Sequence, residues 1–225
     1  MKYEKSEHQA NDVEKNRHLY IGGSDLPSIL RTNAKYGKSL ITFAKEKLKI
    51  IPNTFKGNEY TRYGQLIEPF VRDYMNEMYD YDFREDSKID YDRMYRGNCD
   101  GIDKKRNMLL EVKTFGSKLD VKGYEPQCQF YMNIFDVDEC LLVGYKRPKG
   151  FYSGIDYELD NDNEFFDITF DEENLVVYKI KRNAPLFEKI EKEIDKFKFL
   201  LECLKEEEVL NGRITKQSGI DIDNI

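Results

Sequence analysis

Two carboxylates and a lysine follow one another closely in this sequence, in an order that suits a site for a divalent cation. Asp100 is followed by Glu111 and, two positions later, by Lys113. Carboxylates held near each other repel unless a cation joins them, and oxygen ligands without Cys or His favour a hard ion such as Mg²⁺ or Mn²⁺. An ammonium group beside the ion can orient a water, or act as a base if its pKa falls. Such a set suits the attack of water on a phosphodiester. The alternative is a surface hairpin whose charges form salt bridges.

This site requires a β-hairpin that brings the two segments together. A turn centred on residues 105–106 would place Asp100 directly opposite Glu111, and a turn centred on residues 106–107 would place it opposite Lys113. Side chains of a strand alternate between the two faces, so either register puts all three groups on one face of the sheet. Directly opposed residues have Cβ atoms about 5 Å apart. The sequence leaves the choice of register open.

Two other segments carry polar groups that could join this site. Glu68 lies within the apolar stripe of a predicted helix over residues 59–79, so it is expected to face inward, where a carboxylate needs a partner such as a metal ion. Gln127 and Tyr131 are four residues apart, which places both on one face of a helix. There they could contact a phosphate or orient the lysine. The alternatives are an exposed Glu on an amphipathic helix, and an ordinary interfacial Gln beside a core Tyr.

The pattern of apolar residues predicts a mixed α/β fold, in which helices surround one sheet. Ser24 is expected to cap a short helix with Pro27 in its first turn, and Ser39 a second helix that runs toward Lys49. Strands are expected in the alternating stretch 80–114, and also at 139–145, 151–159 and 165–170. Further helices are expected at 59–79, at 125–135, and as two stretches within 172–208 divided near residues 183–185.

Composition and length indicate one sizeable domain. The chain has 225 residues, of which 40% are hydrophobic and 35% are charged. We expect a flexible start over residues 1–12, a single domain over residues 13–211 and a flexible tail over residues 212–225. No run of about 18 apolar residues is present, and the first residues lack the apolar region of a secretory signal. The four cysteines form no C-x-x-C pair, which favours reduced thiols over a zinc site.

The net charge of −7 argues against nucleic acid as a partner only in a global sense. Binding depends on local charge, and Lys and Arg cluster at residues 45–49, 104–106, 146–149 and 179–182. Such clusters are commonly solvated faces, so charge by itself gives weak support for DNA binding.

Five blocks, in order, resemble one known family. They read RHLYIGGSD at residues 17–25, GQLIEP at 64–69, NCDGI at 98–102, LEVKT at 110–114 and QCQFYM at 127–132. Together they resemble the PD-(D/E)XK nuclease superfamily, and within it the YqaJ-type viral recombinases typified by phage lambda exonuclease. The resemblance covers about residues 17–135, and no single block is specific.

The resemblance implies a restriction-endonuclease-like core, with a central mixed sheet flanked by helices. It also implies a metal-dependent nuclease that digests linear double-stranded DNA from the 5′ end and leaves a 3′ single strand for an annealing protein. The expected cofactor is Mg²⁺, with Mn²⁺ as a substitute. The family further implies a homotrimer encoded by a phage or prophage, which acts in the cytoplasm of the bacterial host.

Residue by residue, the resemblance assigns the metal to Asp100, Glu111 and the carbonyl oxygen of Val112, and makes Lys113 the catalytic lysine. Glu68 corresponds to the helix-borne acidic residue that helps to hold a second metal ion. An endonuclease of the same superfamily, or a DNA-binding module that keeps the fold without catalysis, are the alternatives.

The same comparison places Arg17 and Ser24 near the 5′-terminal phosphate of the substrate, which an Arg fork suits on physical grounds. Gln127 and Tyr131 match the motif that follows the core. One departure is Cys99, which stands before Asp100 where the superfamily pattern has Pro.

Overall fold

The computed structural model describes residues 16–30, 39–53, 57–154 and 165–210. The terminal segments expected to be flexible, residues 1–12 and 212–225, lie outside these ranges. All described strands belong to one sheet.

The sheet has six strands and mixes parallel with antiparallel pairs. Its order is β1–β3–β4–β5–β6, and β2 pairs with β3 beside this path. β1 pairs with β3 in parallel and β4 pairs with β5 in parallel, whereas the other three pairs are antiparallel. The strands are β1 (Ile21–Gly22), β2 (Arg84–Asp90), β3 (Tyr95–Asp103), β4 (Met108–Phe115), β5 (Glu139–Lys146) and β6 (Leu175–Lys181).

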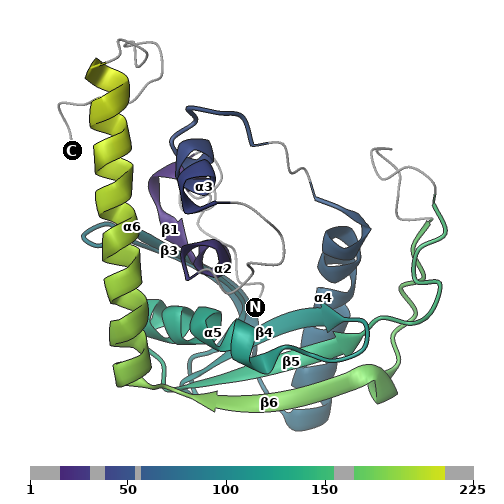
Figure 1. Ribbon diagram of the computed structural model, residues 1–225. Helices are drawn as coiled ribbons and strands as arrows, with labels where there is room; N and C mark the ends of the chain where they lie inside the picture. Colours follow the sequence, from purple (N-terminus) through teal and green to yellow (C-terminus); the bar gives the residue numbers. More distant parts are fainter. Residues whose placement is uncertain (1–15, 31–38, 54–56, 155–164, 211–225) are drawn as a thin grey trace.

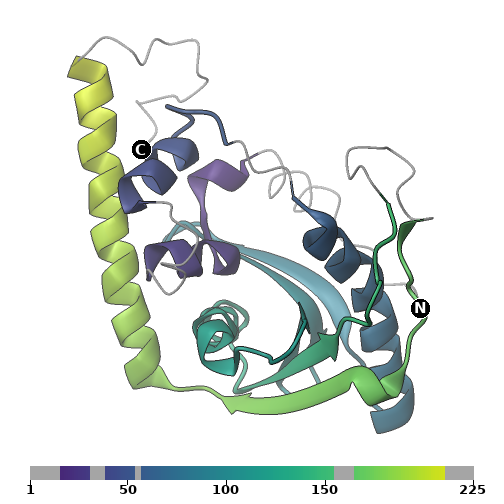
Figure 2. The same cartoon turned by 45° about the vertical axis from the view of Figure 1, so that its right-hand side comes forward.

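Helices cover both faces of this sheet (Figure 1). The helices are α2 (Leu26–Ile29), α3 (Leu40–Lys47), α4 (Glu59–Tyr79), α5 (Val121–Phe135) and α6 (Ala184–Leu210), with short 3₁₀ turns η1 (Arg17–Leu19), η2 (Gly23–Asp25) and η5 (Glu172–Asn174). Neighbouring residues of β5 show the two layers, because Leu141 packs in the core under α4 and Leu142 in the core under α5. The long helix α6 follows β6 directly and packs against α5 and α3 (Figure 2).

This arrangement confirms the expected mixed α/β fold with a central sheet between helices. The helix predicted over residues 59–79 is α4, and its buried side chains Tyr63, Ile67, Val71 and Met75 follow the predicted apolar stripe. No helix in the described residues is long and apolar enough to cross a lipid bilayer. Three of the cysteines, Cys99, Cys128 and Cys140, are buried, Cys203 is exposed, and all four are free thiols.

The first of the two helices predicted within residues 172–208 is wrong, because this stretch forms the strand β6. It pairs with β5 in antiparallel register from Glu139–Lys181 to Tyr145–Leu175. The spaced Glu and Lys residues suggested a helix, but β-branched residues suit a strand, and the open edge of β5 supplies backbone partners for them. Only the second predicted helix forms, as α6.

The strands predicted at 151–159 and 165–170 are also wrong as far as they are described. These stretches contribute a single isolated bridge, between Tyr152 and Phe166. Residues 155–159 of the first stretch lie outside the described residues.

Of the two N-cap residues predicted from the sequence, one is confirmed and one is wrong. Ser39 caps α3 as predicted, because its hydroxyl accepts a hydrogen bond from the Thr42 amide at 3.0 Å. Ser24 does not cap α2, since it lies inside η2 and Asp25 occupies the N-cap position. The Asp25 carboxylate makes other contacts: it accepts a hydrogen bond from the Gly22 amide at 2.8 Å and forms an ion pair with Lys47 at 2.8 Å.

The β3–β4 hairpin adopts the first of the two registers considered. Its paired residues are Gly101–Leu110, Ile102–Leu109 and Asp103–Met108, so the turn centres on residues 105–106. Continuing this register by one residue places Asp100 opposite Glu111.

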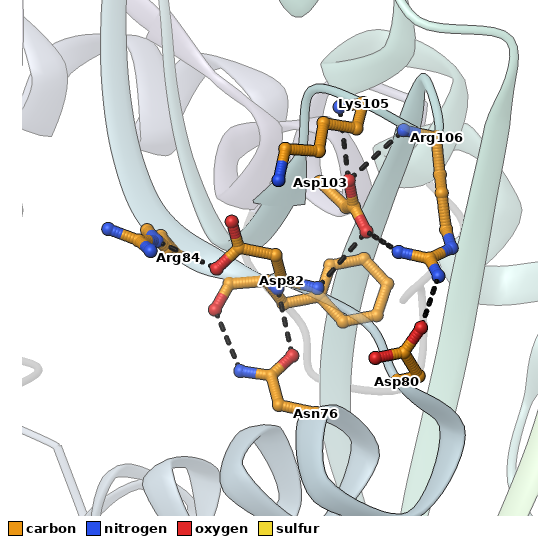
Figure 3. Close-up of polar contacts among 8 residues, drawn as sticks. Asn76, Asp80, Asp82, Arg84, Asp103, Lys105 and Arg106 are labelled. Carbon is orange, nitrogen blue, oxygen red and sulfur yellow. Dashed lines mark hydrogen bonds and ion pairs between the residues drawn. The ribbon is translucent and has the colours of Figure 1, made fainter.

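The buried carboxylate of Asp103 holds this turn in place (Figure 3). It accepts hydrogen bonds from the amides of Lys105 and Arg106 at 3.0 Å each, from the Asp82 amide at 3.1 Å and from the Arg106 guanidinium at 3.0 Å. Arg106 also reaches Asp80, just after α4, at 3.1 Å. Burial alone would raise the pKa of Asp103, but these hydrogen bonds outweigh it and lower the pKa below its ordinary value. The register that aligns the site therefore depends on an ionised Asp103.

We predict that Asp103→Asn lowers the free energy of unfolding by about 1–3 kcal/mol at pH 7, because two of the four backbone and guanidinium donors would face an amide that donates rather than accepts. A carboxylate with a lowered folded pKa stabilises the fold above its unfolded pKa and loses that contribution in acid. The deficit should therefore shrink below about pH 4. Urea unfolding at pH 7 and pH 3.5 measures both values. Asp82→Asn is the matched control, since the Asp82 carboxylate lies at the surface and pairs with Arg84. Equal losses for the two variants would contradict the assignment.

Candidate active site

Asp100 lies at a β-bulge in β3. On the β2 side the pairs Asp86–Cys99 and Arg84–Ile102 leave one residue of β2, Glu85, opposite both Asp100 and Gly101. A bulge of this kind changes the direction of a side chain next to it. The Asp100 carboxylate turns to β4 and accepts a hydrogen bond from the Val112 amide at 2.6 Å.

Glu111 is the most enclosed carboxylate of the group, with 1% of its surface exposed. Its Oε1 accepts a hydrogen bond from Gln127 at 2.7 Å and forms an ion pair with Lys113. Its Oε2 is buried and has no hydrogen-bond partner among the described residues. Burial, followed by the charge of Asp100, raises the pKa of Glu111 to about 8, while Lys113 opposes this shift. This carboxylate has one oxygen free for a cation.

Lys113 is charged in this arrangement. Burial alone would lower its pKa, but Glu111 and Asp100 outweigh burial and raise the pKa above its ordinary value. Of the two roles that the sequence allowed, this favours orientation of a water or phosphate by an ammonium over removal of a proton by a neutral amine.

Glu68 approaches Asp100 and Glu111 from α4, which packs on the face of the sheet opposite α5. Burial, followed by the charge of Asp100, raises the pKa of Glu68 to about 7, while Arg72 opposes this shift. The side chain of Glu68 is 27% exposed, so it lies at the edge of the site and does not point into bulk solvent.

Arg72, one helical turn after Glu68, is a residue of the site that the sequence analysis missed. Its guanidinium donates to Glu68 at 3.2 Å, to the carbonyl oxygen of Asp100 at 2.6 Å and to Glu85 at 2.6 Å. It thus ties α4 to the bulge in β3 and to β2. The i,i+4 spacing from Glu68 was the available signal, but such pairs are frequent in a chain that is 35% charged.

Gln127 and Tyr131 share one face of α5, as predicted. The Gln127 amide donates to Glu111 at 2.7 Å and to the Tyr131 hydroxyl at 3.2 Å. Gln127 therefore orients a carboxylate, and the structure gives it no hydrogen bond to Lys113. Val112 contributes its amide to Asp100, and its side chain packs in the core under α4.

Arg17 and Ser24 lie in the N-terminal segment that packs against Tyr131 of α5. The Arg17 guanidinium donates to the Ser24 hydroxyl at 3.3 Å. Gly23 brings η2 so close to α5 that a Cβ atom there would lie 2.6 Å from the Tyr131 ring. The structure thus brings the N-terminal pair to the helix that carries Gln127, and through Gln127 to Glu111.

The side chains fit a hard divalent cation by chemistry. Burial raises the pKa of all three carboxylates, Glu68, Asp100 and Glu111, and the charge of Asp100 adds to the shift of the other two; Glu111 also keeps an unpaired buried oxygen. Within the described ranges, no three acidic, His or Cys side chains stand at the spacing of a complete metal site. Lys113 holds Glu111 and Arg72 holds Glu68 in this conformation, so a cation would have to turn the carboxylates toward it.

We predict that Arg72→Met lowers the free energy of unfolding by about 2 kcal/mol at pH 8.5, because Glu68 and Glu85 lose their shared cation. The loss should be smaller at pH 6, since Glu68, with a pKa of about 7, is then largely protonated. Urea unfolding at both pH values measures it. Lys179→Met removes an exposed pair with Glu139 and serves as the control, with a change near zero at either pH. A loss that does not depend on pH would contradict the pairing with Glu68.

Comparison with known proteins shows the family of this chain and relates its fold to solved structures. The YqaJ-like viral recombinase domain matches residues 13–137, more than half of the chain. The phage-related exonuclease from Haemophilus somnus 129PT superposes with a TM-score of 0.63 at 20% identity, over 86% of this chain and 99% of that one. The alkaline exonuclease LHK-Exo from Laribacter hongkongensis gives 0.64 at 18% identity, over 88% and 97%. No curated protein matches the sequence. The chain belongs to the YqaJ-like viral recombinase domain family.

Proposed function

We propose that this protein is a nuclease that digests linear double-stranded DNA and depends on Mg²⁺ or Mn²⁺. The observation that carries the proposal is the meeting of three carboxylates, Glu68, Asp100 and Glu111, beside the charged Lys113. Carboxylates whose pKa values are raised by burial and by one another favour a cation that joins them. The family and the fold of the two exonucleases support DNA as the substrate.

The residues divide the work by their contacts. Asp100 and Glu111 would hold the cation, with Glu68 at the edge of the site and the Val112 carbonyl as a further oxygen. When bound, a hard divalent ion supplies Lewis acidity for the attack of water on the phosphodiester. Lys113 donates hydrogen bonds as an ammonium, which suits a phosphate oxygen or the attacking water.

Other side chains position these groups. Gln127 holds Glu111 in place, and the Tyr131 hydroxyl accepts the second hydrogen bond of Gln127. Arg17 and Ser24, which contact each other, are suited to the terminal phosphate at the 5′ end, because an Arg fork matches phosphate oxygens.

The finer parts of the proposal rest on the family resemblance. They are digestion in the 5′→3′ direction, a 3′ single strand passed to an annealing protein in phage-type recombination, a homotrimer, and action in the bacterial cytoplasm. A recombinase family is consistent with all of them.

We predict that Asp100→Asn, Glu111→Gln and Lys113→Met each lower the Mg²⁺-dependent digestion of linear duplex at least about 10³-fold, because each removes a charge from the reacting centre. Duplexes labelled at the 5′ or the 3′ end, resolved on denaturing gels, measure rate and direction together. Release of the 5′ label first supports the proposed polarity.

Closed circular DNA is the control for this test. It should stay intact, because an exonuclease needs an end; cleavage of circles would favour an endonuclease. Circular dichroism spectra must match the wild type for a loss to count as catalytic. Full activity in any of the three variants would remove the assignment.

We also predict that Mg²⁺ binds more weakly as the pH falls from 9 to 6. The raised pKa values, about 8 for Glu111 and about 7 for Glu68, mean that these carboxyls carry protons at pH 6 and must release them to bind a cation. Calorimetric titration in two buffers with different ionisation enthalpies measures both the affinity and the protons released. An affinity that stays constant over this range would contradict cation binding at these carboxylates.

A further inference from the structure

Arg147 directly follows β5 and contacts both the end of β4 and two aromatic rings. Its guanidinium carbon lies 4.8 Å from the ring centre of Tyr60 and 5.6 Å from that of Phe151. Its Nη1 donates to the Thr114 hydroxyl at 2.9 Å, and its amide donates to the carbonyl oxygen of Phe115 at 2.8 Å. Stacking and hydrogen bonding together fix the orientation of the guanidinium plane.

The charge of Arg147 is not balanced by a carboxylate in the described part of the chain. The guanidinium groups of Arg72 and Arg106 each pair with two acidic side chains, whereas Arg147 has no ion pair there. A guanidinium has five N–H donors, and the structure gives this one a single hydrogen bond, to Thr114. Arg147 is only half-buried, and its neighbours Lys146 and Lys149 are exposed. The local field therefore favours an anion.

Arg147 adjoins the candidate active site. Its partner Thr114 is the residue after Lys113 in β4. On the α4 side, Gly64 lies one helical turn, about 5.4 Å, before Glu68. Thr114 packs against this turn of α4, since its hydroxyl oxygen lies 3.9 Å from the position of a Cβ atom at Gly64. The helix α4 packs on β4 (Figure 1).

We propose that Arg147 binds the DNA phosphodiester that is adjacent to the cleaved one. The Tyr60 ring holds the guanidinium in the orientation that this contact requires. This inference rests on the proposed function and adds a contact to the substrate backbone. A planar fork of N–H donors matches two phosphate oxygens, and a preset orientation reduces the entropy lost on binding. Since a backbone contact reads no base, it should act on every sequence alike.

The test is Arg147→Gln, with a linear duplex bearing a 5′ phosphate. We expect KM to rise about tenfold and kcat to change less than about twofold, because the lost contact binds DNA before and during the reaction alike. In EDTA, fluorescence anisotropy should show a similar rise in Kd. The slope of log Kd against log salt concentration should fall by about one.

Matched variants separate a specific contact from the general field. Lys146→Gln removes the same charge from the adjacent residue and should leave KM and the salt slope near the wild type. Tyr60→Phe keeps the ring and should also resemble the wild type, whereas Tyr60→Leu should raise KM. Thermal unfolding checks that each variant is folded.

Two results would overturn the inference. One is a KM for Arg147→Gln that equals the wild type, and the other is an equal rise for Lys146→Gln, which would leave only a diffuse charge effect. In either case wild-type digestion of DNA would leave the proposed function standing. If the wild type digests no DNA with Mg²⁺ or Mn²⁺, the proposed function fails, and this inference fails with it.

Discussion

The burial of Glu111 beside Asp100 is the constraint on which the site depends. Burial and the charge of Asp100 raise the pKa of Glu111, Lys113 opposes this shift, and Gln127 binds the same carboxylate oxygen as Lys113. The second oxygen of Glu111 remains unpaired. A buried carboxylate of this kind contributes little to the stability of the fold, so its role is to bind a ligand such as a cation.

The surrounding elements meet around this group from different parts of the chain. The bulge in β3 turns Asp100 toward β4, and Arg72 from α4 binds the carbonyl oxygen of that same residue. From the other face, α5 supplies Gln127, and Gly23 lets the N-terminal turn lie against Tyr131. Polar side chains from the helices on both faces of the sheet thus converge on the same group of strand residues. This explains why helices on opposite faces contribute to one site.

Cations in this region fall into two kinds. Arg72 and Lys113 are tied to carboxylates of the site and hold it together in the absence of any ligand. Arg147 is stacked on Tyr60 and paired with no carboxylate among the described residues. The first kind stabilises the acidic centre, and the second is placed to receive an anion from outside. An acidic chain can in this way present positive charge where a phosphate backbone would pass.

Much of the fold and the key acidic residues could be predicted from the sequence, because they depend on local periodicity and residue type. The helix over residues 59–79 follows from its apolar stripe, and the pairing of Asp100 with Glu111 was one of two registers that alternation allowed. Tertiary structure alone decided the register, because Asp103 fastens the turn through contacts with Asp82 and Arg106. It also made residues 175–181 a strand, since β5 offered an open edge that outweighed the local helical pattern. The positions of cations relative to carboxylates likewise arise only when distant segments pack together.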